Sequence, residues 1–356
     1  MITSSPPREF ATSFSHERWQ ELSDTGLFSS LSDQTVPGAG LPEAMRRVRE
    51  LGRTSPDRGL TFSAVTQLAS TVYCLSAFGG PAVRSRYLPS AESGAAIGGH
   101  AITEELAGSD ISAMVTSAIR DGDNYVLDGT KKFITNAPIA DTLVVYAKDA
   151  DTNGGLSAFL IETGWPGISI SDPMPTAGLR SSPLGEVTLD RVRVPAENRI
   201  GHAGAGLLVL DQVMKREILL AFAANLGEME RSLNESVAFA NGRQQFGRSI
   251  GSNQLVANRI VESRIAIELG SALLESIVDR LDGFDDVTIP IAAAKIFISE
   301  AHVGCALNAI SLRGGTGYLT TEPYCDNLLD AVPGTIYSGS NDVLRSKIAA
   351  MMGVAT

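Results

Sequence analysis

Hydrophobic positions follow two different periods along the chain. Between about residues 14 and 95 they recur at helical spacing, as in Met45, Val48 and Leu51, and a further apolar stretch covers residues 60–78. Helical spacing returns in segments near 206–240, 254–282, 288–312 and 339–352. These four segments are long enough to form a helical bundle. Two helical blocks therefore flank a different kind of sequence.

The block between them has the pattern of a sheet. Short runs of β-branched and aromatic residues recur between Gly, Asn, Asp and Pro clusters, at 125–127, 133–135, 142–146, 158–161, 168–170 and 186–189. Asp128-Gly129 is a turn signal after the first run. Close spacing without intervening helices predicts an antiparallel sheet or barrel rather than a βαβ fold. We therefore expect an α+β protein with an N-terminal helical domain (1–95), a middle antiparallel β-barrel domain (96–201) and a C-terminal helical bundle domain (202–356).

Composition narrows the class of protein. Hydrophobic residues make up 44% of the 356 residues and charged residues 19%, which is enough to bury a large core. Lys plus Arg total 29 against 40 Asp plus Glu, a formal net charge of −11, which argues against a nucleic-acid-binding protein. Only three cysteines occur, far apart, so we expect a reduced, cytoplasmic protein.

Three further expectations are negative. The first ten residues have no apolar h-region, so we expect no secretory signal. No run of about 18 apolar residues occurs, so we expect no membrane insertion. The four histidines show neither HxxxH nor HExxH spacing, so we expect no metal site.

Glu217 is the first candidate for chemistry. Its neighbours three and four residues away on a helix are Val213, Met214, Leu220 and Ala221, all apolar. An acid on an apolar face is costly unless it is paired, and burial raises its pKa toward the range of a general base. The alternative is a structural acid paired with a distant cation, and the local sequence favours neither.

Other motifs have two readings each when they are taken singly. Residues 103–110 form either a surface turn or a loop that hydrogen-bonds a polar ligand. Arg243 is either a clamp for a pyrophosphate or a cation favoured at a helix C-terminus. The glycines of 314–317 follow a helix, which favours a helix C-cap over a dinucleotide-binding loop. Ser338, Ser340 and Asp342 are typical of a helix start.

Together these motifs resemble the acyl-CoA dehydrogenase family of flavoproteins, over nearly the whole chain and in the family's order. The matching segments are 103–110 (TEELAGSD) with the family's TEPxAGSD, 127–136 (LDGTKKFITN) with LNGxKxWITN, 190–195 (DRVRVP) with DxVxVP, 243–247 (RQQFG) with RxxFG, and 314–318 (GGTGY) with GGxGY. Gln254 matches the glutamine downstream of RxxFG. The family's architecture is also helices, a β-barrel and a four-helix bundle.

The resemblance implies FAD, bound between the middle and last domains and across a subunit interface of a homodimer or homotetramer. At the flavin end of the cofactor it assigns Thr103 and Thr135 to the ring, Phe133 beside the ring, Ser109 near flavin and thioester, and Ser340 on FAD. It assigns Gly314 and Gly315 to the adenosine diphosphate half. It assigns Arg243, Phe246 and Gln254 to the adenosine diphosphate half of the FAD bound by a neighbouring subunit.

The family reaction is α,β-dehydrogenation of an acyl thioester, in which a carboxylate removes the α-proton and the β-hydrogen leaves as hydride. Ser338 stands where many members have the basic Glu, and a serine hydroxyl is too weak a base to replace it. Its backbone N–H can still polarise the thioester carbonyl. Some members carry the base on the first helix of the last domain, and an ungapped match over 206–227 places Glu217 there.

We therefore expect an FAD-dependent dehydrogenase of an acyl-CoA or acyl-carrier-protein thioester, with Glu217 and Ser338 as catalytic residues. Its electrons would pass to electron-transfer flavoprotein or to oxygen. Two alternatives stay open: a flavin oxidase or monooxygenase on the same fold, and a non-catalytic flavin-binding relative. Ser311 and Leu329, which stand where Gln and Arg are usual, motivate the second alternative together with Ser338.

Overall fold

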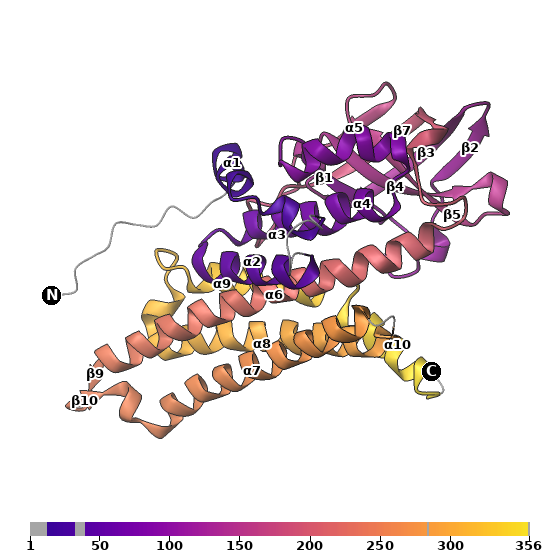
Figure 1. Ribbon diagram of the computed structural model, residues 1–356. Coiled ribbons are helices and arrows are strands. Elements are labelled where there is room, and N and C mark those ends of the chain that lie inside the picture. The colour runs from indigo at the N-terminus through magenta and orange to yellow at the C-terminus, as the bar shows by residue number, and fades with distance from the viewer. Residues whose placement is uncertain (1–12, 33–39, 283–284, 355–356) are drawn as a thin grey trace.

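The computed structural model describes residues 13–32, 40–282 and 285–354. The ten residues in which no secretory signal is expected lie outside these ranges. Helices cover the described chain up to Glu92, strands follow between Gly98 and Ile200, and long helices follow from Gly206. Figure 1 shows the sheet at one end of the molecule, the bundle extending away from it, and the first helices lying along both.

The N-terminal helices have several local start signals. Ser15 and Asp57 cap two of them by accepting hydrogen bonds from Arg18 N and Leu60 N, and Pro81 begins a third. The elements are α1 (His16–Asp24), η1 (Phe28–Leu31), α2 (Leu41–Thr54), α3 (Arg58–Thr66), the π-helix η2 (Gln67–Tyr73), α4 (Cys74–Phe78) and α5 (Pro81–Glu92). Because α3, η2 and α4 follow one another without a break, they form one continuous helix with a π segment at its centre.

The middle block forms one sheet with the strand order β6-β7-β3-β2-β4-β5-β8, and β1 pairs with β4. Its strands are β1 (Gly98–Ala101), β2 (Ser117–Asp121), β3 (Asn124–Thr135), β4 (Thr142–Asp149), β5 (Leu156–Glu162), β6 (Ile168–Ile170), β7 (Leu184–Pro195) and β8 (Arg199–Ile200). Short 3-10 turns lie between them: η3 (Ile111–Ala113), η4 (Ala137–Ile139), η5 (Ala150–Thr152) and η6 (Ala196–Asn198). In β4, Leu143 and Val145 face a core within the sheet domain, whereas Val144 and Tyr146 face the helices.

The expectation of an antiparallel β-barrel is only partly correct. Among the described strands, the path from β6 to β8 does not close, and β1 and β2 both run parallel to β4. The two strands share one edge of β4, with β1 along residues 142–145 and β2 at Lys148 and Asp149. Apolar runs predict strands, but they do not fix which strands become neighbours.

The predicted turn at Asp128-Gly129 is also wrong. Strand β3 continues through it as a bulge, where the register against β7 shifts between Leu127 and Gly129. Gly129 has φ +150°, and a Cβ there would lie 2.4 Å from Thr116 Oγ1. Glycine is therefore required at this position, because Thr116 lies too close for a side chain. An Asp-Gly dipeptide, which favours a turn, here accommodates a bulge.

The C-terminal block confirms the four predicted helical segments closely. They are α6 (Gly206–Gly242), α7 (Gln254–Asp282), α8 (Thr288–Arg313) and α10 (Asn341–Met351). Between them lie the hairpin β9 (Gln244–Gln245) and β10 (Arg248–Ser249), the short helices η7 (Ile250–Ser252), η8 (Gly314–Tyr318) and η9 (Val332–Thr335), and α9 (Tyr324–Ala331). Gly314 caps α8 with φ +58°, as the glycine run predicts.

One helix bears on the expectation about membranes. Among the described residues, 288–318, which comprise α8 and η8, are long and apolar enough to cross a membrane by length and composition. Half of the most apolar window is buried inside the protein. A core helix of a bundle has the same composition, so the absence of membrane insertion stays a prediction.

Helices α2 and α6 touch through their backbones at two glycines. A Cβ on Gly227 would lie 1.9 Å from Arg49 O, and a Cβ on Gly52 would lie 2.1 Å from Ala224 O. Neither distance leaves room for a methyl group. The two glycines therefore set how closely the N-terminal helices approach the helix that carries Glu217.

We predict that Gly227→Ala destabilises the protein by about 2–3 kcal/mol, since the added methyl group forces two backbones apart. Gly242→Ala is the matched control, because it lies in the same helix and its Cβ would meet nothing within 4 Å. Urea unfolding of both variants measures the difference. Equal unfolding midpoints for the two variants would contradict the close contact.

Candidate active site

The carboxylate of Glu217 lies at the meeting point of three elements from distant parts of the sequence. It is 5% exposed on α6. Ser338 Oγ donates to its Oε1 at 2.5 Å, Ser70 Oγ donates to its Oε2 at 3.0 Å, and His100 Nε2 lies 3.2 Å from Oε2. Its sequence neighbours point elsewhere, since Lys215 pairs with Asp211 and the Arg216 guanidinium lies over the Tyr73 ring.

The expectation that burial raises the pKa of Glu217 is wrong in its net direction. Burial is the largest single influence and does raise the pKa. The charge and hydrogen bond of His100, together with the hydroxyls of Ser338 and Ser70, outweigh it and lower the pKa below its usual value. Glu217 is therefore ionised at neutral pH, and its ionisable partner is a histidine rather than a distant Lys or Arg.

The π-helix brings Ser70 to this carboxylate. Gln67 opens the π segment, its Nε2 donates to Ala91 O and Ala96 O, and its Oε1 accepts from Gly98 N at 2.7 Å. Gly98 begins β1, which carries His100 two residues later. One buried amide thus ties the π-helix to the strand, and Ser70 and His100 reach Oε2 from these two elements. π segments are frequent at functional sites.

Ser338 lies in a strained loop before α10. Its φ is +54°, in the left-handed region that a non-glycine residue rarely adopts. Ser340 is the N-cap of α10 and accepts from Val343 N, and Asp342 lies in the first turn, as predicted. The sequence therefore locates this helix start, while the contact of Ser338 with Glu217 comes only from the fold.

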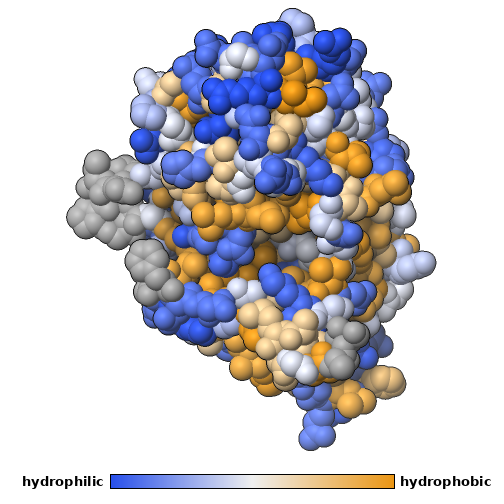
Figure 2. All heavy atoms as spheres, turned by 90° about the vertical axis from the view of Figure 1, so that its right-hand side faces the viewer, coloured by the Kyte–Doolittle hydropathy of each residue, from blue (hydrophilic) through white to orange (hydrophobic). Residues whose placement is uncertain are grey.

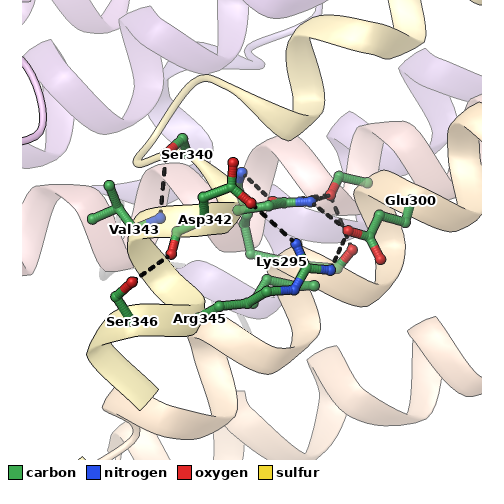
Figure 3. A network of polar contacts seen from close by, with 10 residues as sticks. Lys295, Glu300, Ser340, Asp342, Val343, Arg345 and Ser346 are labelled. Carbon is green, nitrogen blue, oxygen red and sulfur yellow. Dashed lines mark hydrogen bonds and ion pairs between the residues drawn. The ribbon is translucent and has the colours of Figure 1, made fainter. Parts of the chain in front are cut away.

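A polar network in which Lys295 and Asn341 are buried holds that loop against α8 (Figure 3). Lys295, which is fully buried, donates through Nζ to Asn341 Oδ1 at 2.7 Å, and Asn341 Nδ2 donates to Glu300 Oε1 at 3.1 Å. Arg345 pairs with the same carboxylate of Glu300. Burial lowers the pKa of Lys295 to about 8. These contacts fix the residue that follows Ser340 and so restrict the position of Ser338.

Four of the predicted cofactor residues lie on the C-terminal part of β3 and on the loop beside it. Lys132 N donates to Thr103 O at 2.8 Å, which places Thr103 beside the β3 segment that carries Phe133 and Thr135. Phe133 has φ +57° and is 59% exposed. Ser109 lies exposed on the loop that begins at Thr103.

A buried ion pair anchors that loop. Lys131 Nζ, on a fully buried side chain, donates to Glu104 Oε1 at 2.8 Å, and Glu104 also accepts from Val115 N and Thr116 N. Burial lowers the pKa of Lys131 to about 8, against the influence of Glu104. The backbone that carries Thr103 is therefore held rigidly although its outer residues are exposed.

The other predicted cofactor residues lie at the far end of the bundle. Figure 1 shows the β9–β10 hairpin at the opposite end of the molecule from the sheet. Arg243 and Phe246 belong to that hairpin segment, and Gln254 begins α7 just after it. Phe246 is fully exposed with φ +52°. Gly314 and Gly315 end α8, which runs back to the same end.

One chain therefore does not bring the predicted FAD residues together. Thr103, Ser109, Phe133 and Thr135 form one group at β3 and the loop beside it, and the bundle end forms a second, while Ser340 lies in the loop before α10. Within the part of the chain that the structure describes, the hydroxyls of Thr103, Ser109 and Thr135 have no hydrogen-bond partner. A Cβ on Gly314 or Gly315 would meet nothing within 4 Å, so open space lies beside both glycines. Free hydroxyls, an exposed ring and open glycines fit the two halves of FAD.

His100 and Ser70 are the site residues that the sequence analysis did not find. Each is separated from Glu217 by more than a hundred residues, and neither stands in a recognisable motif. His100 Nδ1 is buried and has no hydrogen-bond partner among the described residues, and its ring meets that of Tyr146 edge-on at 6.4 Å between centroids. Only the fold places them at the carboxylate.

Metal chemistry receives no support from the described residues. Ranges 13–32, 40–282 and 285–354 contain no group of three His, Cys, Asp or Glu residues that could hold a metal ion. His100 and His302 each lie beside one glutamate, Glu217 and Glu228 respectively.

Comparison with known proteins identifies relatives along the chain. The acyl-CoA dehydrogenase N-terminal, middle and C-terminal domain models match residues 7–95, 99–192 and 204–353. An L-prolyl-[peptidyl-carrier protein] dehydrogenase from a Serratia species is 34% identical over 96% of this chain and 89% of its own length.

Solved structures agree with these matches. The structure of PigA with FAD and proline has a TM-score of 0.92 at 34% identity, covering 96% of this chain and 91% of that one. The prolyl acyl carrier protein oxidase AnaB has a TM-score of 0.91 at 33% identity, covering 96% and 92%.

We predict that His100→Gln raises the pKa of Glu217, because the variant removes the charge that lowers it most while an amide can still donate a hydrogen bond. A carbon-13-edited infrared titration of the glutamate carboxyls measures this, with Glu217→Gln used to identify the band. The protonation midpoint moves to higher pH in His100→Gln. An unchanged midpoint would show that His100 does not stabilise the carboxylate.

Proposed function

The chain belongs to the acyl-CoA dehydrogenase family, and we propose that it dehydrogenates a short acyl or aminoacyl group carried as a thioester on a carrier protein, with Glu217 as the catalytic base. As a member of this family it is an oxidoreductase of CH–CH groups that uses FAD. The carrier protein, the base and the acyl class are the parts that we propose.

The observation that carries this proposal is the ionised, buried carboxylate of Glu217. Each of the three proposed domains contributes one of its contacts, through Ser70, His100 and Ser338. A carboxylate offers about four acceptor sites, of which three are occupied here. The remaining site can take one proton. An acid held in this form and aimed at one space suits a base that accepts an α-proton.

The geometry also explains how the base can be absent from the position where many family members have it. Ser338 stands at that position, and its hydroxyl lies 2.5 Å from Glu217 Oε1. The two positions therefore face the same small space, one from the loop before α10 and one from α6. A base on either of them reaches the same substrate carbon, so moving the carboxylate does not require moving the substrate.

The chain's own residues divide the remaining work. When bound, FAD accepts the β-hydrogen as hydride. Glu217 takes the α-proton on its free acceptor site and becomes a neutral acid. The backbone N–H of Ser338 donates to the thioester carbonyl and stabilises the charge that develops there. His100 and Ser70 are positioning residues that hold Oε2 so that the carboxylate keeps one orientation.

The carrier protein enters the proposal from the relatives. The Serratia relative and AnaB are named for prolyl groups on carrier proteins, and both match along almost the whole chain. A CoA thioester is the second candidate, because the matched family models are those of acyl-CoA dehydrogenases. The name of AnaB as an oxidase favours oxygen as one electron acceptor, with electron-transfer flavoprotein as the other.

The split between the two groups of predicted cofactor residues supports a homo-oligomer. The β9–β10 hairpin, whose segment includes Arg243 and Phe246, lies at the opposite end of the molecule from the sheet that carries Thr135 (Figure 1). Hydrophobic residues also gather in a band across the middle of the face shown in Figure 2, below a mainly hydrophilic region. We propose a homodimer or homotetramer in which the hairpin of one copy completes the FAD site of another.

We predict that a thioester substrate added anaerobically to the purified holoenzyme bleaches the flavin absorbance and that Glu217→Gln slows this by at least about a thousandfold, because the amide cannot accept the α-proton. Glu230→Gln is the matched control, since it removes a partly buried acid from the same helix at a distance from the site. The panel contains prolyl and short acyl groups on a carrier protein and on CoA.

Each outcome of this experiment has a distinct meaning. Bleaching by wild type and the control but not by Glu217→Gln supports the proposed base, and the panel ranks carrier protein against CoA. Undiminished bleaching in Glu217→Gln overturns the base. If no thioester in the panel bleaches the wild-type flavin, the proposed substrate class fails and the oxygen-using and non-catalytic alternatives take its place.

A further inference from the structure

A small pocket lies along the interface of α3 and α6, beginning at Ala221, one helical turn beyond Glu217. On α6 the residues at successive turns beyond Glu217 are Ala221, Asn225 and Glu228, all of which line it. On α3 the facing residues recur at the same helical spacing. The pocket is lined by Arg58, Thr61, Phe62, Val65, Leu179, Ala221, Ala224, Asn225, Glu228, Asp330 and Tyr337. From Glu217 to Glu228 is eleven residues, or about 16 Å along the helix axis.

Two aromatic rings lie across this pocket close to Glu217. The rings of Phe62 and Tyr337 are 4.6 Å apart between centroids, and Tyr337 directly precedes Ser338. Asn225 Nδ2 donates to Tyr337 Oη at 3.1 Å, which fixes the ring. Burial raises the pKa of Tyr337, and the charges of Glu228 and Glu217 raise it further. Both carboxylates thus act on Tyr337.

Beyond the rings the pocket is polar. Arg58 Nε lies 3.2 Å from Glu228 Oε2, and both residues are 4% exposed. Arg58 also donates to Asn327 O, and His302 Nε2 lies 3.3 Å from the same Glu228 oxygen. Asp330 contributes a second carboxylate, which accepts from Leu179 N. Burial raises the pKa of Glu228 to about 7, so this carboxylate is already poorly solvated.

An alkyl chain gains little binding free energy beside these charged residues. A methylene group that enters an apolar tunnel gains about 0.8 kcal/mol, because it leaves water for apolar contacts. A methylene that enters the space beside Arg58 and Glu228 has to separate the members of a buried ion pair, which costs free energy that the methylene cannot return. Only an acyl group that ends before the rings avoids this cost.

We propose that the Phe62–Tyr337 ring pair and the Arg58–Glu228 ion pair behind it limit the substrate to thioesters with a short acyl group, and so act as specificity-determining residues. This inference rests on the proposed function, because it uses Glu217 as the point where the acyl group enters. It makes no use of the carrier, since the limit is set at the opposite end of the acyl group.

Binding without turnover tests the limit directly. The probes are butanoyl, hexanoyl and octanoyl thioesters of pantetheine, the arm that CoA and carrier proteins share. Calorimetric titrations use the FAD-loaded holoenzyme with Glu217→Gln, so that no probe is consumed. Without a limit, affinity rises about fourfold for each added methylene. We expect instead that hexanoyl and octanoyl bind no more tightly than butanoyl.

Two variants alter the ring pair and the ion pair independently. Phe62→Ala removes one ring and leaves every charge in place. Arg58→Leu with Glu228→Leu removes both members of the ion pair together, so that neither is left without the other. Arg49→Leu with Glu230→Leu is the matched control, because that ion pair also joins an N-terminal helix to α6 but does not line the pocket.

We expect octanoyl to gain at least about tenfold over butanoyl in Phe62→Ala or in the double variant Arg58→Leu with Glu228→Leu, and to gain nothing in the control. A tenfold preference for octanoyl over butanoyl in the Glu217→Gln holoenzyme without further changes overturns the proposal. The proposal is also overturned if neither Phe62→Ala nor the double variant changes the relative affinities of the three thioesters. Flavin bleaching by butanoyl-pantetheine in the wild type is read separately: its absence removes the proposed dehydrogenation, while the binding series still tests the length limit.

Discussion

One buried negative charge organises this molecule. Glu217 is almost completely shielded from water, and an unpaired carboxylate there would be too costly to keep. Its solvation shell is replaced by Ser70 from a π-helix, His100 from a strand and Ser338 from a strained loop. Because the donors come from three separate parts of the sequence, the charge is tolerated only when those parts are assembled together. The same requirement fixes the geometry in which a substrate meets the carboxylate.

The sequence predicts the helices of the bundle well and the topology of the sheet less well. Helical period and capping residues such as Ser340 are local, so they reveal where α10 begins without any knowledge of the fold. The parallel pairings of β1 and β2 with β4 depend on which strands meet after the loop between them folds. Asp128-Gly129 shows the same limit, because an Asp-Gly dipeptide occurs both in turns and in bulges.

The candidate site divides in a similar way. An acid on an apolar helix face singles out Glu217, and motif resemblance singles out residues such as Thr103 and Arg243. Neither signal reveals His100, which changes the sign of the pKa shift that burial alone predicts. The outcome of burial depends on the partners that a buried group finds, and those partners lie far away in the sequence. Spatial arrangement also separates the predicted cofactor residues into two groups, which no linear motif indicates.

The π segment between α3 and α4 changes which side chains of this continuous helix face α6. An α-helix turns once in 3.6 residues, whereas a π turn takes in one extra residue. Arg58, Phe62 and Val65 face α6 at ordinary spacing, and Ser70 faces it five residues after Val65. The wider turn thus corrects the rotation that would otherwise carry Ser70 away from Glu217. Deleting a single residue within η2 would swing the following helix by about 100° and disconnect one half of this face from the other.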